Sequence, residues 1–212
     1  MNKYSPQEER FNVISHAIGF LLSIVALILL ISKTVPLGNT LHIVSIIIYG
    51  VSLLVMYAAS TLYHNEKAPK LRMRLKIFDH AAIFLLIAGT YAPYTLITLN
   101  ETVGWMIFSV VWGIAFAGII LKLFFTGKYK IVSTIMYVLM AWVIVFVVKP
   151  LMDNLSIEGL FWLAAGGVAY MIGALLYSIE KIKFNHAIFH VFVLIGSFCH
   201  FYSIYAYVLP TK

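Results

Sequence analysis

Seven long apolar stretches dominate the sequence and constrain the fold more than any other feature. A helix needs roughly 20 apolar residues to cross the hydrocarbon core of a bilayer, and its backbone hydrogen bonds must close within the span. The sequence therefore predicts an all-α integral membrane protein, a bundle of seven transmembrane helices in one domain over residues 1–212. The expected spans are Val13–Ile31, Leu41–Tyr63, Ile77–Ile97, Val103–Leu123, Ile131–Val148, Leu160–Ile179 and Ala187–Leu209.

The composition agrees with a membrane location. Of the 212 residues, 62% are hydrophobic and 11% are charged, whereas a soluble domain carries about 25% charged residues. The first apolar stretch has no small-residue cleavage site after it, so we expect an uncleaved first helix. The single cysteine, Cys199, cannot form a disulfide within the chain.

The basic residues predict the orientation of the helices. Of the 15 Lys and Arg residues, 12 lie before the first span, at the inner end of the fourth span, or in the loops after the second, fourth and sixth spans, and 3 lie on the opposite side. Loops rich in Lys and Arg stay in the cytoplasm, so we predict a cytoplasmic N-terminus and an outside C-terminus. This distribution also explains the net charge of +7 without a nucleic-acid partner.

The prolines mark most of the expected span ends. Pro93 lies inside the third span, where a proline should kink the helix. The other five lie at or outside span ends, where we expect no helix to be broken; they are Pro6, Pro36, Pro69, Pro150 and Pro210.

A few ionisable residues lie at the ends of spans, where such residues are usually functional. His186 and His190 are four residues apart and share one helix face, as do Ser60 and His64. Asp79 opens the third span. With the N-terminus inside, all five residues fall at the same membrane depth, near the cytoplasmic face.

Three imidazoles at one depth can fill three of the four positions around zinc, which leaves the fourth for water or substrate. Zinc lowers the pKa of a bound water toward about 7. We therefore predict a Zn²⁺ site formed by His64, His186 and His190. Asp79 would orient or deprotonate the water, and Ser60 would donate a hydrogen bond to the substrate.

A second polar stripe precedes the first span. Glu9, Asn12 and His16 lie three and four residues apart, on one helix face. Zinc-bound histidines usually donate their other ring N–H to an acceptor, a role open to Glu9, Asn12 or Asp79. For His16 we favour an outer position or helix packing over ligation.

The remaining histidines fit structural roles better than ligation. His80 is turned away from Asp79 on its helix, and His42 lies at the outer end of the second span. His200 lies ten residues beyond His190 and either packs in the core or lines a cavity.

Three sequence patterns together resemble the hemolysin III family, the bacterial branch of the progestin and adiponectin receptor family. The patterns are Glu9-x-x-Asn12-x-x-x-His16, then Ser60-x-x-x-His64 with Phe78-Asp79-His80, and finally Asn185-His186-x-x-Phe189-His190. The resemblance implies a seven-helix bundle in a bacterial plasma membrane, with its N-terminus inside and zinc held by His64, His186 and His190. It also implies kinship with alkaline ceramidases, which hydrolyse a lipid amide.

Three functions remain open at this point. The first is a zinc-dependent hydrolase that acts on an amide or ester of membrane lipids, which would enter laterally between helices. The second is a pore-forming hemolysin, and the third is a non-catalytic sensor of the membrane state with structural zinc. The sequence names neither the lipid nor any protein partner.

Overall fold

The computed structural model describes residues 4–99, 101–125 and 130–209. Within these residues the secondary structure is helical and contains no strand. Seven helical segments of this described part are long and apolar enough to cross a membrane, which confirms the expected fold class. They are Pro6–Leu37, Thr40–Asn65, Pro69–Thr98, Thr102–Phe125, Val132–Asn154, Ile157–Ser178 and Asn185–Val208.

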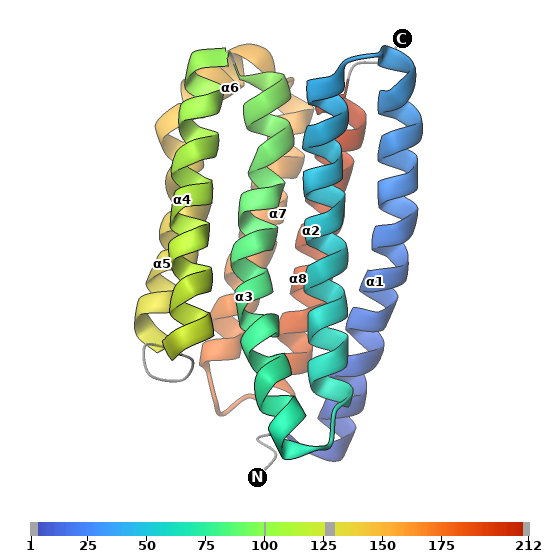
Figure 1. The fold of residues 1–212 in the computed structure, drawn as a ribbon, viewed down its shortest axis with the longest axis vertical. Helices are drawn as coiled ribbons and strands as arrows, with labels where there is room; N and C mark the ends of the chain where they lie inside the picture. The colour runs from blue at the N-terminus through green and yellow to red at the C-terminus, as the bar shows by residue number, and fades with distance from the viewer. Residues whose placement is uncertain (1–3, 100, 126–129, 210–212) are drawn as a thin grey trace.

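The helices run side by side along the long axis of the molecule (Figure 1). Helix α1 packs against α2 and α8, α2 also packs against α3, and α7 packs against α8. The first and last described residues lie at opposite ends of the bundle, as an odd number of spans requires (Figure 1). The helices are α1 (Pro6–Thr34), α2 (Thr40–Asn65), α3 (Pro69–Pro93), α4 (Glu101–Phe125), α5 (Lys130–Trp142), α6 (Val148–Asn154), α7 (Ile157–Ser178) and α8 (Asn185–Ser203).

The surface and the interior of the bundle suit a lipid solvent. Large apolar side chains face outward; Phe146 is 86% exposed and Phe124 is 74% exposed. Hydroxyl groups inside the bundle pair with one another, because lipid offers them no partner. The Tyr57 hydroxyl donates to Ser197 Oγ at 2.8 Å, and the Tyr170 hydroxyl lies 2.8 Å from the same atom.

The start of α1 turns two carboxylates inward. Ser5 caps the helix by accepting a hydrogen bond from the backbone N–H of Glu8, and Pro6 occupies the first turn, where its missing N–H costs nothing. Glu8 and Glu9 follow in that turn, where negative charge is favoured by the helix dipole. Both are buried, so the first turn of α1 delivers two acidic groups to the interior of the bundle.

The third span changes at Pro93, the proline expected to disturb it. Helix α3 ends at Pro93, and the chain continues as a π-helical turn over Tyr94–Thr98. Proline lacks an N–H, which leaves a carbonyl of the preceding turn without its usual partner. The Thr95 hydroxyl donates to the carbonyls of Tyr91 and Ala92 nearby, at 2.8 and 3.3 Å.

The expectation that Pro150 lies outside a helical span was wrong. Pro150 lies within α6, and the preceding residues Val143–Val147 form a 3-10 segment between α5 and α6. Proline at position 150 cannot donate to the carbonyl of residue 146 and clashes with it, so regular α-helix cannot continue through this turn. Tyr91 compensates for the break: its hydroxyl donates to Met140 O at 2.7 Å and accepts from Ile144 N at 2.9 Å.

Candidate metal centre

Three histidine side chains converge between α2 and α8. His64 lies in the last turn of α2, while His186 and His190 lie in the first two turns of α8. Nε2 of His186 is 3.0 Å from Nε2 of His64 and 3.0 Å from Nε2 of His190. His64 and His190 are buried, and His186 is partly buried. The structure thus brings together the three residues expected from the sequence, in an arrangement that could hold a metal ion.

The outer ring nitrogens determine the tautomers of His64 and His190. Nδ1 of His64 lies 2.7 Å from Oε2 of Glu9, and Nδ1 of His190 lies 3.3 Å from the backbone oxygen of Asn12. An ionised carboxylate and a carbonyl only accept hydrogen bonds, so both Nδ1 atoms carry the proton. In neutral rings the lone pairs are then on Nε2, the atoms that face His186.

This arrangement fits a bound cation. Lone pairs gathered at about 3 Å repel one another unless a positive charge lies among them. Tetrahedral ligands with metal–nitrogen bonds of about 2.0–2.1 Å are spaced about 3.3 Å apart, close to the 3.0 Å that separates Nε2 of His186 from each of its neighbours. The donor set, three imidazole nitrogens of which two belong to rings whose outer N–H groups are held by oxygen atoms, matches a metal centre.

His186 is held by two residues that the sequence analysis did not single out. Nδ1 of His186 lies 3.3 Å from the Tyr4 hydroxyl, and the two rings stack with their centroids 4.7 Å apart. The backbone N–H of His186 donates to Oε1 of Glu8 at 3.3 Å. Burial, together with the nearby Tyr177, raises the pKa of Tyr4, so its hydroxyl stays protonated at neutral pH. Glu8 could have been suspected from its place beside Glu9, but no spacing pattern points to Tyr4.

Arg72, near the start of α3, connects the end of α2 to Glu9. Its Nη1 donates to the backbone oxygens of Tyr63, His64 and Glu66 at 3.2, 3.3 and 2.8 Å. Its Nη2 forms an ion pair with Oε1 of Glu9. These bonds satisfy carbonyls that the C-terminus of α2 leaves without helical partners. Arg72 therefore fixes the turn that carries His64 and also the carboxylate that His64 contacts.

Asp79 and Ser60 lie beside the cluster. Ser60 is buried on α2, one turn before His64, and Asp79 lies on α3. The Asp79 carboxyl interacts with the Ser60 hydroxyl and with His64. Asp79 and Ser60 therefore form a polar pair on the His64 side of the site, outside the group of three that could bind the metal.

Comparison with known proteins decides the family. A family model described as "Haemolysin-III related" matches residues 4–201 of the chain. The chain belongs to the haemolysin-III-related family.

Two curated relatives match nearly the whole chain, and a third matches about three quarters of it. This chain is 45% identical to "Hemolysin-3" of Bacillus cereus over 205 residues, which make up 97% of this chain and 94% of the relative. It is 43% identical to "Hemolysin-3 homolog" of Bacillus subtilis (strain 168), with 96% of each chain covered. The human "Monocyte to macrophage differentiation factor" is 31% identical over 76% of this chain and 68% of its own length. These matches confirm the family resemblance and, with the seven apolar spans, a multi-pass membrane protein.

In this haemolysin-III-related chain, the polar stripe of α1 (Glu9, Asn12 and His16) contacts two of the three clustered histidines. Glu9 contacts His64, and Asn12 lies next to His64 and His190. His16 is 3% exposed and stacks on His190, with ring centroids 3.5 Å apart and planes inclined by 10°. Among the residues that the structure describes, neither ring nitrogen of His16 has a hydrogen-bond partner. The structure places His16 against the ring of His190, outside the group of three that could hold a metal ion.

His200 and His42 lie apart from the cluster. Nε2 of His200 donates to the backbone oxygen of Leu163 at 3.1 Å, and its ring packs directly over Gly166 of α7. A side chain at Gly166 would collide with this ring, because a Cβ there would be 2.2 Å from it. His42 lies in the first turn of α2, at the opposite end of that helix from His64.

Proposed function

We propose that this chain is a zinc-dependent intramembrane hydrolase that acts on an amide or ester bond of a membrane lipid. It would lie in the plasma membrane of a bacterial cell, with the histidine cluster at the cytoplasmic face. The observation that carries the proposal is the convergence of three Nε2 atoms, from His64, His186 and His190, with 3.0 Å between neighbours. Three protein ligands are typical of catalytic zinc, whereas structural zinc usually has four.

Zinc suits this donor set among the metals that bind imidazole. Neutral histidine nitrogen is a common zinc ligand, and zinc imposes no geometry of its own beyond a preference for four ligands. When bound, zinc supplies a Lewis acid that polarises a carbonyl and acidifies a water molecule. Glu9 and Asn12 would orient His64 and His190 by accepting their Nδ1–H groups, as partners of zinc-bound histidines commonly do.

Asp79 and Ser60 would carry the proton transfer and the substrate contact. The Asp79 carboxyl interacts electrostatically with His64, so we assign it the role of accepting the proton of the attacking water. The Ser60 hydroxyl interacts with Asp79 and can donate a hydrogen bond to the charge that develops on the substrate oxygen. Both roles rest on the position of these groups beside the ligand cluster.

Metal analysis and hydrolysis assays on purified protein test the proposal together. We expect about one zinc per chain, lost on substitution of His64, His186 or His190 by alanine and retained in the matched control His42→Ala. We further expect release of fatty acid from defined lipid amides or esters by the wild type, and loss of that release in Asp79→Asn with the zinc retained. Equal release by the wild type and Asp79→Asn would refute the assigned mechanism.

A pore-forming activity is a second candidate, favoured by the name "Hemolysin-3" of a relative that is 45% identical. Dye leakage from liposomes distinguishes the two functions when the wild type is compared with His186→Ala. Leakage that persists after loss of the metal would indicate a pore. Metal that stabilises the fold, in a protein without turnover or leakage, would instead indicate a membrane sensor with structural zinc.

A further inference from the structure

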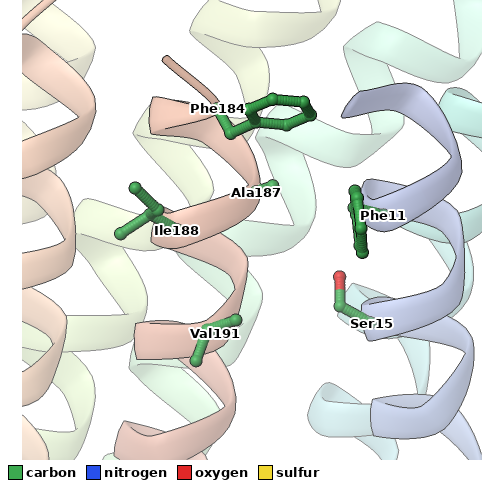
Figure 2. Close-up of a pocket in the computed structure, with 6 residues that line it drawn as sticks. All are labelled: Phe11, Ser15, Phe184, Ala187, Ile188 and Val191. Carbon is green, nitrogen blue, oxygen red and sulfur yellow. The ribbon is translucent and has the colours of Figure 1, made fainter. Parts of the chain in front are cut away.

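Two of the three clustered histidines are each fixed in one tautomer by their outer partners. Nδ1 of His64 lies 2.7 Å from the carboxylate of Glu9, which only accepts hydrogen bonds. Nδ1 of His190 lies 3.3 Å from the backbone oxygen of Asn12 and 3.3 Å from Oγ of Ser15. Ser15 lies on the side of α1 that faces α8 (Figure 2), and it donates its own proton to the Asn12 oxygen at 3.1 Å. Both rings therefore carry their proton on Nδ1.

His186 has an outer partner of a different kind. Its Nδ1 lies 3.3 Å from the hydroxyl of Tyr4, and a hydroxyl can either donate or accept a hydrogen bond. The same hydroxyl lies 3.3 Å from the hydroxyl of Tyr177 on α7. If Tyr4 donates to Nδ1, the His186 ring carries its proton on Nε2. If Tyr4 instead donates to Tyr177, its oxygen accepts from Nδ1–H of His186, and Nε2 presents a lone pair.

Both tautomers of His186 find partners without movement of the ring. Nε2 of His186 is 3.0 Å from the Nε2 atoms of His64 and His190, so a proton on it can be donated to one of their lone pairs. The ring also packs against Tyr4 and Tyr177, with centroids 4.7 Å and 5.0 Å apart. These ring contacts do not depend on which nitrogen carries the proton. His186 is thus the one member of the three whose surroundings accept either tautomer.

We propose that Tyr4 is a positioning residue that lets His186 exchange between two tautomers, one that closes the metal-free cluster by a hydrogen bond and one that binds the metal. The inference rests on the proposed function, because it concerns the metal of the same site. The nitrogen of a histidine that binds a metal is set by the hydrogen bond that the other nitrogen makes. For His64 and His190 that bond is the same in both states, so His186 alone completes the metal site when the metal arrives.

The exchange conserves the number of protons. On metal binding, the His186 ring loses a proton from Nε2 and gains one at Nδ1, while the Tyr4 hydroxyl turns from Nδ1 toward Tyr177. Water can carry the proton between the two nitrogens, because His186 is only partly buried. In the metal-bound state Nδ1–H of His186 donates to the Tyr4 oxygen, an outer contact of the kind that zinc-bound histidines usually make.

Nitrogen-15 NMR of the purified protein with labelled histidines tests the exchange directly, because protonated, unprotonated and metal-bound ring nitrogens have different chemical shifts. In the wild type treated with a chelator, we expect the proton of His186 on Nε2; after addition of zinc, we expect it on Nδ1. His64 and His190 should keep Nδ1–H in both samples. A His186 proton on the same nitrogen with and without bound zinc would overturn this inference alone. A wild type that binds no zinc would overturn the proposed function as well.

Removal of single hydroxyl groups supplies a second measurement, the zinc affinity from competition with a chelating dye. Tyr4→Phe keeps the stacked ring but removes the hydroxyl at Nδ1 of His186, so we expect the affinity to fall about 10- to 100-fold. Tyr177→Phe removes the group that receives the Tyr4 proton in the metal-bound state. It should also lower the zinc affinity, while the metal-free protein keeps the His186 proton on Nε2.

The matched control is Tyr202→Phe, which removes a hydroxyl from another pair of tyrosines, Tyr202 and Tyr207, near the C-terminal end of the described chain. This variant should bind zinc as the wild type does. A zinc affinity equal to the wild type in Tyr4→Phe or in Tyr177→Phe would overturn the role assigned to the two hydroxyl groups.

Discussion

Nδ1 of His64 lies 2.7 Å from Oε2 of Glu9, and this contact determines which nitrogen of His64 is available to a metal. Because the carboxylate only accepts hydrogen bonds, His64 must carry its proton on Nδ1, and the Nε2 lone pair is left facing His186. The other carboxylate oxygen of Glu9 is paired with Arg72. A single buried glutamate on α1 thus links a candidate ligand on α2 to a cation on α3.

Replacing Glu9 tests this link. In Glu9→Gln the acceptor of His64 becomes a weaker, neutral oxygen, so the ligand loses basicity and orientation. We expect the zinc affinity to fall about 10- to 100-fold, the usual effect of losing such a partner. Competition with a chelating dye measures the affinity. Glu158→Gln, at an exposed site in the first turn of α7, is the matched control, and an affinity equal to the wild type in Glu9→Gln would contradict the prediction.

Arg72 should influence the metal through the same glutamate. Arg72→Ala removes the ion pair with Glu9 and the donors to the end of α2, so both zinc affinity and the melting temperature should decrease. Arg72→Lys retains the charge but not the planar fork that reaches several carbonyls at once. We expect it to recover most of the zinc affinity and less of the thermal stability. Equal losses in the two variants would show that charge at this position is unimportant.

His16 offers a test of ligation against packing. Its ring stacks on His190, and neither of its nitrogens has a hydrogen-bond partner within the described part of the chain. Phenylalanine has a flat ring of similar size but no ligand atom, so His16→Phe should retain about one zinc per chain. Metal analysis of the purified variant decides the matter: a chain without zinc would identify His16 as a ligand.

Removal of the metal should loosen the contact between α2 and α8. Any ligand that binds only the folded state stabilises it, by about 2.7 kcal/mol at a concentration 100 times the dissociation constant. We therefore expect a chelator to lower the melting temperature of the wild type in detergent and added zinc to restore it. His186→Ala should not respond to either treatment. If the chelator leaves the melting temperature of the wild type unchanged, that result would argue against a bound metal.

Tyr91 should stabilise the irregular fifth span. Its hydroxyl accepts from the backbone N–H of Ile144 and donates to the backbone oxygen of Met140. Tyr91→Phe leaves both groups unpaired inside the protein, at a cost of about 1–3 kcal/mol. The free energy of unfolding in detergent should decrease by this amount while the zinc content stays constant. No change in stability would show that other groups satisfy this backbone.

The sequence predicted the spans and the three converging histidines because the first depend on the length of apolar stretches and the second depend on residue spacing along helices. Apolar length locates a membrane helix, and a spacing of four places His186 and His190 on one face. The ring nitrogens and their partners depend instead on packing between distant helices. Tyr4 lies outside every periodic pattern, and Arg72 resembled one more basic residue of a cytoplasmic loop. Pro150 falls inside the fifth span because that span extends to Asn154, beyond the end that hydropathy alone indicated.

The cluster joins the two extremes of the chain. His64 and His186 are 122 residues apart, and the contact between Tyr4 and His186 bridges 182 residues. During synthesis the N-terminal part of a chain leaves the ribosome first, so α1 and α2 must wait for α8 before the three imidazoles can meet. Metal uptake by a newly made chain would therefore report that its final helix has reached its place, and a ribosome that stalls before α8 would leave a product without this centre.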